Sequence, residues 1–430
     1  MKLDETTAKK VFVASAGAAI FVSGALIGAL APPVNGALVR AAKEIGDIRR
    51  NFLAYAGLRP IGHLEPFRRE IFNAVQVNKA FAQPGVTLVT GLFGDRLAAR
   101  LYDIDGEVIH EWPNNFFDIF ERGKKYKFDA LLHGDHLYPN GDLLVSIDGR
   151  GLARVNACGD VIWKSMVRSH HSIDIDDDGY IWTPHSPKLY DDKRLAEEPV
   201  RIDRLIKIDP DTGEIVEKIE LAEILLRDRT ESIIKGNRVR PSDVFHLNDV
   251  EILKKHMAEA FPMFSPGDIM LSSRNINLTI VLDGKTRDIK WRRIGPAHGQ
   301  HDPDFQPNGE ISIFDNRIAG EAERGNNFLG NAGGSRIIAI RPDRFGYRTI
   351  YESDERNAFY SAYRGKHQML ENGNVLITES EGGRIFEATA NGDIAWMLVN
   401  KYDENTVGWL MSATRYPVSY ASIGAACAER

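Results

Sequence analysis

Hydrophobic and polar positions repeat a two-part pattern along the chain from about residue 85 onward. The second part of each repeat is a polar, glycine-containing turn followed by a run of alternating apolar and polar residues. It occurs six times: YDIDGEVIHEW (102–112), VNACGDVIW (155–163), IDPDTGEIVEKI (208–219), LDGKTRDIKW (282–291), RPDRFGYRTIY (341–351) and ATANGDIAW (388–396). A period of two predicts a half-buried strand after each turn.

The first part of each repeat is a strand, an Asx-Gly turn and a second strand. Its copies are HLYPNGDLLVSI, HSIDIDDDGYIW, FSPGDIMLSS, DFQPNGEISIF and HQMLENGNVLIT, with QPGVTLVT as a reduced first copy. Two hairpins per unit give four antiparallel strands. Six such units predict an all-β fold, a six-bladed β-propeller over residues 85–415. A solenoid fits less well because the units are long and built of hairpins, and a sandwich would not repeat six times.

One N-terminal segment departs from this pattern. Val11–Ala31 reads VFVASAGAAIFVSGALIGALA, twenty-one residues without a charge, with two lysines before it and two prolines after it. A helix of this length crosses a bilayer, so we expect a membrane anchor within residues 1–35. A cleaved signal peptide is the rival interpretation, because Ala29-Leu30-Ala31 is similar to a processing site. A soluble core helix is a third.

The remaining segments flank the predicted propeller. Residues 36–84 mix alanine, leucine and basic residues around two prolines, and we expect a helical juxtamembrane stalk there. Residues 416–430 follow the last repeat, and we expect a C-terminal tail.

Composition fits a globular chain and excludes some classes of function. The 430 residues are 43% apolar and 27% charged, which is too apolar for a disordered chain and too polar for a polytopic membrane protein. Residues 1–85 carry a net charge of +5, and the remainder, with 43 Lys or Arg against 54 Asp or Glu, carries −11. An acidic propeller predicts no nucleic-acid partner. The two cysteines, Cys158 and Cys427, form at most one disulfide bridge.

Five of the twelve histidines share one register, ahead of the first hairpin turn of a blade. They are His136, His171, His246, His301 and His367. The first strand of a blade is the innermost, so this register predicts a ring of imidazoles at one mouth of the central channel. For any single member the alternative is a packed histidine that bonds to a neighbouring blade. His170 and His185 break the register, and we expect them to be structural.

The histidines alone do not predict a metal site. Imidazole is a common metal ligand, but the chain has no HxH or HExxH motif and the nearby carboxylates are limited to Asp302 and Asp135. Residues Asp174 to Gly179 are similar to the start of an EF-hand loop, but strands flank them, so we interpret them as an acidic hairpin turn.

Several phrases resemble, in order, those of the bacterial arylsulfate sulfotransferase (arylsulfotransferase) family. They are HLNDVEIL, SPGDIMLSSRNINLTIVLD, WRRIG, QHDPDFQPNGEISIFDN, GGSRIIAI and HQMLENGNVLIT, and the resemblance extends over roughly residues 85–415. It implies a six-bladed propeller. It also implies an enzyme that moves a sulfuryl group from a phenolic sulfate ester to another phenol through a covalent sulfohistidine. Neither a nucleotide donor nor another cofactor is implied.

The resemblance implies roles for particular residues. It makes His367 the candidate nucleophile, with His246 and His301 as its partners around the sulfuryl group and Asn248 and Arg317 nearby. Arg336 and Arg274 are alternatives to Arg317, because Arg317 follows Asn316 directly whereas the family's arginine comes a few residues later. His171 is a further substrate-binding candidate. Because His367 and Gln368 are adjacent, strand alternation is expected to send one to the channel and the other into the blade.

Two functions from different classes are therefore carried forward. The first is a single-pass, membrane-anchored arylsulfotransferase, with its propeller on the periplasmic or extracytoplasmic side and residues 11–31 in the membrane. The second is a non-catalytic propeller that serves as a binding or scaffold subunit of an envelope membrane complex; a homo-oligomer or such a complex is compatible with the sequence. A quinone-cofactor dehydrogenase is disfavoured because no adjacent Cys pair is present.

The anchor gives the first testable prediction. Full-length protein should stay with the membrane pellet after an alkaline carbonate wash and retain its N-terminal residues in mass spectrometry. A mature N-terminus at or near Pro32 would instead identify a cleaved signal peptide.

Overall fold

The computed structural model describes residues 63–68, 74–120, 130–235, 243–318 and 333–427. The chain divides into two compact units, Met1–Gly62 and His63–Arg430, and every described residue lies in the second. The predicted anchor and most of the predicted stalk lie outside these ranges. Among the residues described, no helix is both long and apolar enough to cross a membrane.

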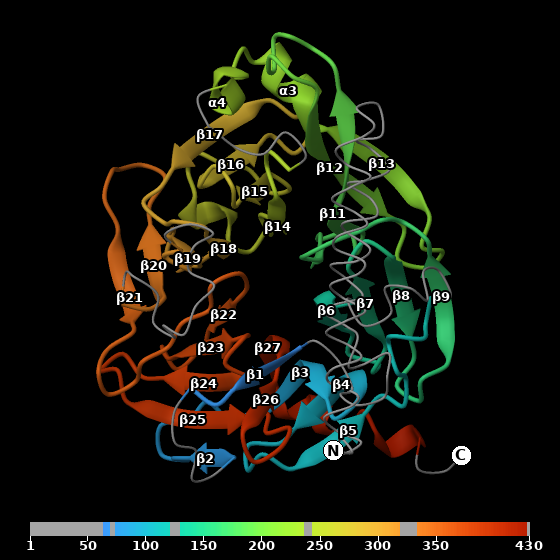
Figure 1. Cartoon of the computed structure of the whole chain (residues 1–430), viewed down its shortest axis with the longest axis vertical. Coiled ribbons are helices and arrows are strands. Elements are labelled where there is room, and N and C mark those ends of the chain that lie inside the picture. Colours follow the sequence, from blue (N-terminus) through green and yellow to red (C-terminus); the bar gives the residue numbers. More distant parts are fainter. Residues whose placement is uncertain (1–62, 69–73, 121–129, 236–242, 319–332, 428–430) are drawn as a thin grey trace, which may run out of the picture. The chain divides into compact units, whose positions relative to one another are not determined.

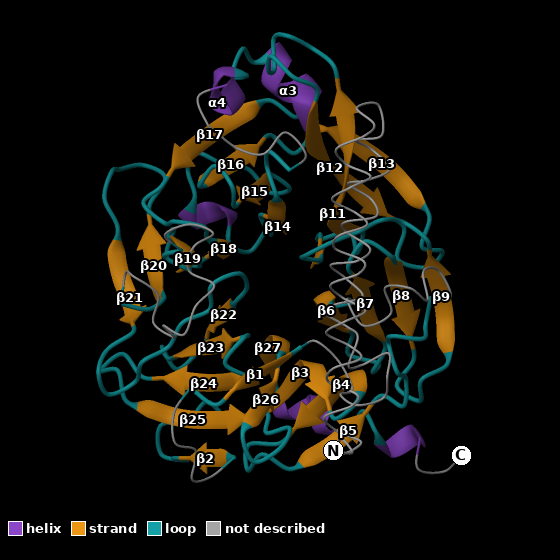
Figure 2. Ribbon diagram, in the orientation of Figure 1, coloured by secondary structure: helices purple, strands orange, loops and turns teal. Residues whose placement is uncertain are grey.

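Six antiparallel sheets surround a central axis in the described part of the second unit, which confirms the predicted six-bladed propeller (Figures 1 and 2). From the axis outward, blade one is β27 (Leu410–Tyr416), β3 (Val86–Phe93), β4 (Arg96–Tyr102) and β5 (Val108–Glu111); blade two is β6 (Leu132–Leu137), β7 (Leu143–Ile147), β8 (Gly151–Val155) and β9 (Val161–Ser165); blade three is β10 (Asp174–Ile175), β11 (Ile181–Tyr190), β12 (Val200–Ile208) and β13 (Ile215–Glu220). Blade four is β14 (Leu247–Ile252), β15 (Ile269–Ser273), β16 (Leu278–Leu282) and β17 (Ile289–Ile294); blade five is β18 (His301–Phe305), β19 (Ile311–Asp315), β20 (Arg336–Ile340) and β21 (Arg348–Glu352); blade six is β22 (Lys366–Met369), β23 (Val375–Glu379), β24 (Arg384–Ala388) and β25 (Ile394–Val399).

The predicted Asx-Gly turns connect the first two strands of the blades. Gly141 and Gly309 follow asparagines in two of them and have φ angles of 87° and 79°. These angles lie in the left-handed region that glycine adopts readily. A Cβ atom on Gly309 would also lie 2.4 Å from the Ala260 carbonyl oxygen, so that turn requires glycine for space as well.

The end of the predicted stalk is extended, not helical. Leu64–Pro66 forms strand β1, which pairs with β26 (Thr406–Gly408), and Val75–Val77 forms β2, which pairs with β25 at the outer edge of blade six. Both segments add a strand to an element that already offers unpaired backbone groups, and this pairing favours extended backbone over a helix. Helices are few in the described ranges: α3 (Leu221–Arg227), α4 (Ser232–Lys235) and the 3-10 turns η3 (Ala258–Ala260), η5 (Val418–Ser422) and η6 (Ala425–Cys427).

Two connections close the ring. Strand β27 pairs with β3, so the end of the chain supplies the innermost strand that the reduced first repeat lacks. Cys158, in the turn between β8 and β9, forms a disulfide with Cys427, which is 269 positions further along the chain. The predicted tail is therefore fixed covalently to blade two.

Side-chain oxygens join the innermost strands of successive blades. At five of the six junctions in the described residues, an oxygen of one blade accepts a main-chain N–H of the next. These bonds are Leu137 N to Tyr416 Oη (3.2 Å), Ile252 N to Asp174 Oδ2 (2.7 Å), Phe305 N to Glu251 Oε2 (2.6 Å), His367 N to Asp302 Oδ2 (2.6 Å) and Arg415 N to Gln368 Oε1 (2.7 Å). An innermost strand has no further strand on its axial side, so these bonds satisfy N–H groups that would otherwise be unpaired.

Burying the acceptor carboxyls has an electrostatic consequence. Burial first, and the neighbouring Asp174 second, raise the pKa of Glu251 well above its ordinary value. A carboxyl whose folded-state pKa is raised binds more protons in the folded than in the unfolded chain. The folded protein therefore loses stability from Glu251 as the pH rises from the unfolded pKa, about 4.3, towards the folded one.

Replacement of Glu251 separates its two effects. Glu251→Gln keeps an acceptor for the Phe305 N–H but removes the charge, so its Tm relative to the wild type should be higher at pH 8 than at pH 5. Glu251→Ala removes the acceptor and should lower the free energy of unfolding by about 1–3 kcal/mol. The exposed Glu371→Gln is the control and should show no pH-dependent difference. Equal shifts for Glu251→Gln at both pH values would contradict the raised pKa.

Candidate active site

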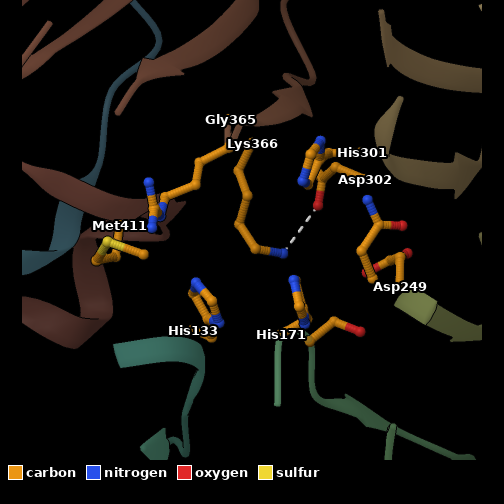
Figure 3. Close-up of a pocket in the computed structure, with 11 residues that line it drawn as sticks. His133, His171, Asp249, His301, Asp302, Gly365, Lys366 and Met411 are labelled. Carbon is orange, nitrogen blue, oxygen red and sulfur yellow. Dashed lines mark hydrogen bonds and ion pairs between the residues drawn. The ribbon is translucent and has the colours of Figure 1, made fainter. Parts of the chain in front are cut away.

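All six blades contribute to one pocket around the axis (Figure 3). Its lining includes Met411, His133, His171, Asn248, His301 and Lys366, which belong to blades one to six in that order. We call it the axial pocket. Two of the five histidines that the sequence placed at one mouth of the channel, His171 and His301, line it.

Irregular backbone at the start of the innermost strands aims these side chains. The strand pairing skips one residue in three blades, at Met411 in β27, His133 in β6 and Asn248 in β14, and it also shifts between His301 and Asp304 in β18. A β-bulge of this kind turns the extra residue out of the regular ladder. All three skipped residues line the axial pocket.

Blade three uses strained backbone in place of a bulge. His171 has a φ angle of 62°, an uncommon conformation for a residue other than glycine. Its carbonyl oxygen comes so close to blade two that a Cβ atom on Gly134 would lie 2.7 Å from it. Gly134 therefore allows the histidines of blades two and three to approach each other, with 4.5 Å between the ring centroids of His133 and His171.

His301 has the geometry of a nucleophile. Its Nδ1 lies 2.8 Å from Asn316 Oδ1, whereas its buried Nε2 has no hydrogen-bond partner among the described residues. Burial first, and the Arg274 guanidinium second, hold the pKa of His301 well below its ordinary value. The imidazole is therefore neutral at neutral pH, with a lone pair free on Nε2.

Three cationic side chains accompany it. The Arg364 guanidinium lines the pocket and lies 4.5 Å above the Trp409 ring, and Arg274 lies 5.3 Å from the ring centre of Tyr363. In the described part of the chain, the buried Nε atoms of both arginines have no hydrogen-bond partner. Lys366 Nζ lies 2.8 Å from Asp302 Oδ1, an ion pair that Figure 3 marks. Two guanidinium groups with N–H donors to spare suit an anionic ligand.

Other histidines of the site are backed by carboxylates. The His246 Nδ1 lies 2.7 Å from Asp243 Oδ2, His170 Nε2 lies 3.6 Å from Asp203 Oδ1, and His133 Nδ1 lies 3.7 Å from Asp148 Oδ1. Although burial favours the neutral acid, the hydrogen bond with His246 lowers the pKa of Asp243 overall. The His171 ring lies against the rings of both His133 and His246, with centroid distances of 4.5 Å and 4.9 Å. A carboxylate partner stabilises a protonated imidazole, whereas the amide behind His301 does not.

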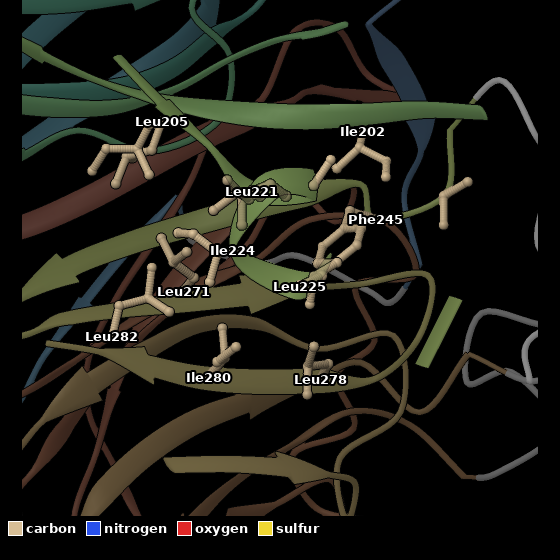
Figure 4. Close-up of a cluster of buried hydrophobic side chains, with 14 of the residues drawn as sticks. Ile202, Leu205, Leu221, Ile224, Leu225, Phe245, Leu271, Leu278, Ile280 and Leu282 are labelled. Atoms are coloured by element: carbon tan, nitrogen blue, oxygen red, sulfur yellow. The ribbon is translucent and has the colours of Figure 1, made fainter. Parts of the chain in front are cut away.

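An apolar cluster holds the backbone of His246. Its neighbours Phe245 and Leu247 are buried among residues of blades three and four and of helix α3, which contributes Leu221, Ala222, Ile224 and Leu225 (Figure 4). Helix α3, which lies between blades three and four in the chain, thus supports the residue that carries the His246 imidazole.

The structure places His367 outside the axial pocket. Its side chain is fully buried, with Nδ1 3.1 Å from Asp302 Oδ2 and Nε2 2.7 Å from Ser312 Oγ. We expected one of His367 and Gln368 to face the channel and the other to enter the blade. Neither faces the channel, because alternate residues of β22 face the two neighbouring blades. His367 faces blade five, Gln368 accepts a hydrogen bond from Arg415 of blade one, and Lys366 reaches the pocket.

The other candidates divide between the pocket and the scaffold. Asn248 lines the pocket, donates from Nδ2 to the Gln300 carbonyl (2.7 Å) and leaves its buried Oδ1 without a partner among the described residues. His136 packs against Tyr138, with ring centroids 4.7 Å apart, and does not line the pocket. Arg317 pairs with Glu352 and Arg336 with Asp315, so Arg274 is the arginine that acts on His301.

The residues of the site that sequence reasoning missed include His133, Asn316, Arg364 and Lys366. His133 lies three residues before the register histidine of its blade, and the bulge that turns it inward has no sequence signature. His170 and His185 were expected to be structural. His185 accepts a bond from Arg204, but His170 lies against His171, with 2.9 Å between their Nδ1 atoms.

Carboxylates and a histidine also gather below the pocket. Asp302, Asp304 and His367 are the one group in the described ranges whose potential metal-ligand atoms all lie within 4.8 Å of one another. Lys366 already supplies a cation there, because Asp302 and Asp249 raise its pKa although burial opposes this. The Asp174 to Gly179 segment forms the β10–β11 hairpin turn, as interpreted, with Asp176 Oδ1 accepting the N–H groups of Asp178 and Tyr180.

Comparisons with known proteins add a family. A family model described as arylsulfotransferase (ASST) matches residues 135–401. No curated protein matches the chain. Solved structures that resemble it include a protein of unknown function from Bacteroides caccae (12% identity, TM-score 0.47, 76% of this chain and 99% of that one) and TolB from Acinetobacter baumannii (10% identity, TM-score 0.45, 77% and 67%). Virginiamycin B lyase from Staphylococcus aureus is a third (12% identity, TM-score 0.34, 62% and 69%).

The different positions of the two histidines predict different effects on stability. His367→Ala breaks buried bonds to Asp302 and Ser312 and should lower the free energy of unfolding by about 3 kcal/mol. His301→Ala removes one bond at a cavity wall and should cost about 1 kcal/mol. Urea denaturation of both variants measures the difference, and equal losses would contradict the placement of His367 in the scaffold.

Proposed function

Since this chain belongs to the arylsulfotransferase family, we propose that it transfers a sulfuryl group from a phenolic sulfate ester to another phenol, with His301 as the nucleophile. One observation carries the assignment: the His301 Nε2 atom is buried in the axial pocket without a partner among the described residues, while Asn316 holds its Nδ1. A neutral imidazole with a fixed tautomer presents its lone pair in one direction, which is what a nucleophile requires.

The first half of the reaction forms the sulfohistidine. The Nε2 lone pair of His301 attacks sulfur, the S–Nε2 bond forms, and the S–O bond to the aryl group breaks. His246, whose Nδ1 lies 2.7 Å from Asp243 Oδ2, gives a proton to the departing phenolate oxygen. In the second half, His246 takes the proton of the incoming phenol, whose oxygen attacks sulfur and releases His301.

Arg274 and Arg364 meet the charge of the sulfuryl group. The transition state spreads negative charge over three oxygens, so fixed N–H donors in a buried pocket stabilise it. The two unpartnered Nε–H groups supply donors without reorganisation. His171 lies between His133 and His246 and completes the wall on the side of blade three.

His367 has a supporting role in this proposal. It shares Asp302 with Lys366, and it fixes the strand from which Lys366 reaches the pocket. The nucleophile assigned from the family resemblance thus moves from blade six to blade five.

An extracytoplasmic location is part of the proposal. The Cys158–Cys427 disulfide is of a kind that persists in oxidising compartments and is rare in the cytosol. Together with the apolar segment at residues 11–31, it favours a propeller tethered to the outer face of a membrane. An oligomer or a membrane-complex partner stays a prediction.

The test uses full-length protein in detergent with 4-nitrophenyl sulfate as donor and phenol as acceptor. We expect phenol-dependent release of 4-nitrophenol and a sulfuryl adduct on the peptide that contains His301. His301→Ala should lower kcat at least about a thousandfold. His136→Ala, outside the pocket, is the matched control and should keep wild-type activity.

Two results would contradict the proposal in different ways. An adduct on the His367 peptide would return the nucleophile to blade six. No adduct and no release of 4-nitrophenol would remove the enzymatic function and favour the binding or scaffold propeller.

A further inference from the structure

Asn316 is buried directly after strand β19, and its side chain fixes the tautomer of His301. Its Nδ2 donates to two main-chain carbonyls, those of Ser361 and Arg364, each at 2.6 Å. Carbonyl oxygens only accept, so the NH₂ end of the amide must face them. The oxygen end therefore faces His301 Nδ1 at 2.8 Å, and that nitrogen must carry the proton.

The same amide links the nucleophile to a cation. Asn316 holds the backbone of the loop that carries Arg364, and Ser335 Oγ donates to the Asn316 and Ser361 carbonyls of the same network. A single side chain thus sets the orientation of His301 in blade five and the position of the Arg364 backbone before blade six.

An amide differs from a carboxylate in one chemical property that matters here: it does not accept a proton. Once sulfur is bonded to Nε2, an imidazole that keeps its Nδ1 proton is an imidazolium, and it leaves as neutral imidazole when an acceptor oxygen attacks sulfur. A carboxylate at this position would draw the proton away. The ring would then be a neutral sulfuryl-imidazole, which would have to leave as imidazolate, a much poorer leaving group.

We propose, resting on the function proposed above, that Asn316 is a positioning residue that retains the Nδ1 proton of His301 through the transfer cycle and so keeps the sulfohistidine reactive towards the acceptor. In the second half of the cycle the acceptor oxygen forms its bond to sulfur, the S–Nε2 bond breaks with its electron pair returning to Nε2, and the phenolic proton goes to His246. The Nδ1 proton stays in place throughout, so no additional reactant is required.

The charged groups that face His301 agree with this role. Arg274 and His246 of blade four and His133 of blade two all disfavour a positive charge on the imidazole. The sulfohistidine is therefore formed near the Arg274 guanidinium, which opposes its imidazolium, and this raises its tendency to release the sulfuryl group. The hydrogen bond to Asn316 Oδ1 keeps the proton on His301 Nδ1 despite this positive charge.

Asn316→Asp tests the proposal, with Asn391→Asp in an exposed turn of blade six as the matched control. Both are made in the full chain, and their Tm values verify folding. Rapid-quench kinetics with 4-nitrophenyl sulfate should show that Asn316→Asp still forms the adduct, whereas its decay on addition of phenol slows at least tenfold. Because the new carboxylate raises the pKa of His301, the acidic limb of kcat/KM should also move to higher pH.

Asn316→Ala separates positioning from packing, since it removes the contact without adding an acceptor for the proton. We expect it to slow adduct formation and adduct decay together, with no accumulation. Wild-type adduct decay and an unchanged pH profile in Asn316→Asp, with His301→Ala still abolishing the adduct, would overturn this inference and leave the proposed function intact. Absence of any adduct in the wild-type protein would overturn both.

Discussion

The fold depends on the hydrogen bond from a main-chain N–H of one innermost strand to a side-chain oxygen of the blade before it. The innermost strands lack a neighbour on their axial side, and a closed ring leaves no room there for another strand. Asp174, Glu251, Asp302 and Gln368 supply the missing acceptors in turn, and Tyr416 continues the series from blade one to blade two. Each blade is thereby held in register by its neighbour, so side chains from six different blades meet in one pocket with fixed geometry.

The same constraint explains which histidine is left for chemistry. Carboxylates buried near the axis need partners, and Asp302 has an ion pair with Lys366 and hydrogen bonds with His367. His367 is thereby fully engaged in the scaffold. His301 lies at the start of its strand, where the pairing shifts, and it has an amide for a partner and a free Nε2.

Most of the architecture could be predicted from the sequence, because a hairpin repeat has a period that the side chains express directly. The blade count, the strands and the reduced first copy that β27 completes all follow from it. Two of the five register histidines, His171 and His301, line the pocket, and His246 lies against His171. The rest could not be predicted because a single extra residue in a strand changes which side chain turns inward. This substitutes His133 for His136. On the regularly paired strand β22, Lys366 reaches the pocket in place of His367 because His367 faces blade five. The family resemblance predicted the type of reaction, but it could not predict which side chains the backbone irregularities turn into the pocket.

In the proposed reaction, the anionic donor must be bound by positive charges near the pocket and not by the overall charge of the propeller. The residues after 85 carry a net charge of −11, so the field of the propeller repels a sulfate ester at long range. Among the cations near the axis, Lys366 is paired with Asp302 and Arg364 with Glu381, but the Nε–H groups of Arg274 and Arg364 are buried without partners in the described part of the chain. Burying such a donor is costly until an acceptor arrives. An entering sulfuryl group relieves that cost, and a neutral phenol does not. In the proposed reaction the two unpaired Nε–H groups therefore favour the charged end of the donor ester in the pocket and leave the acceptor to be recognised by its ring and its proton.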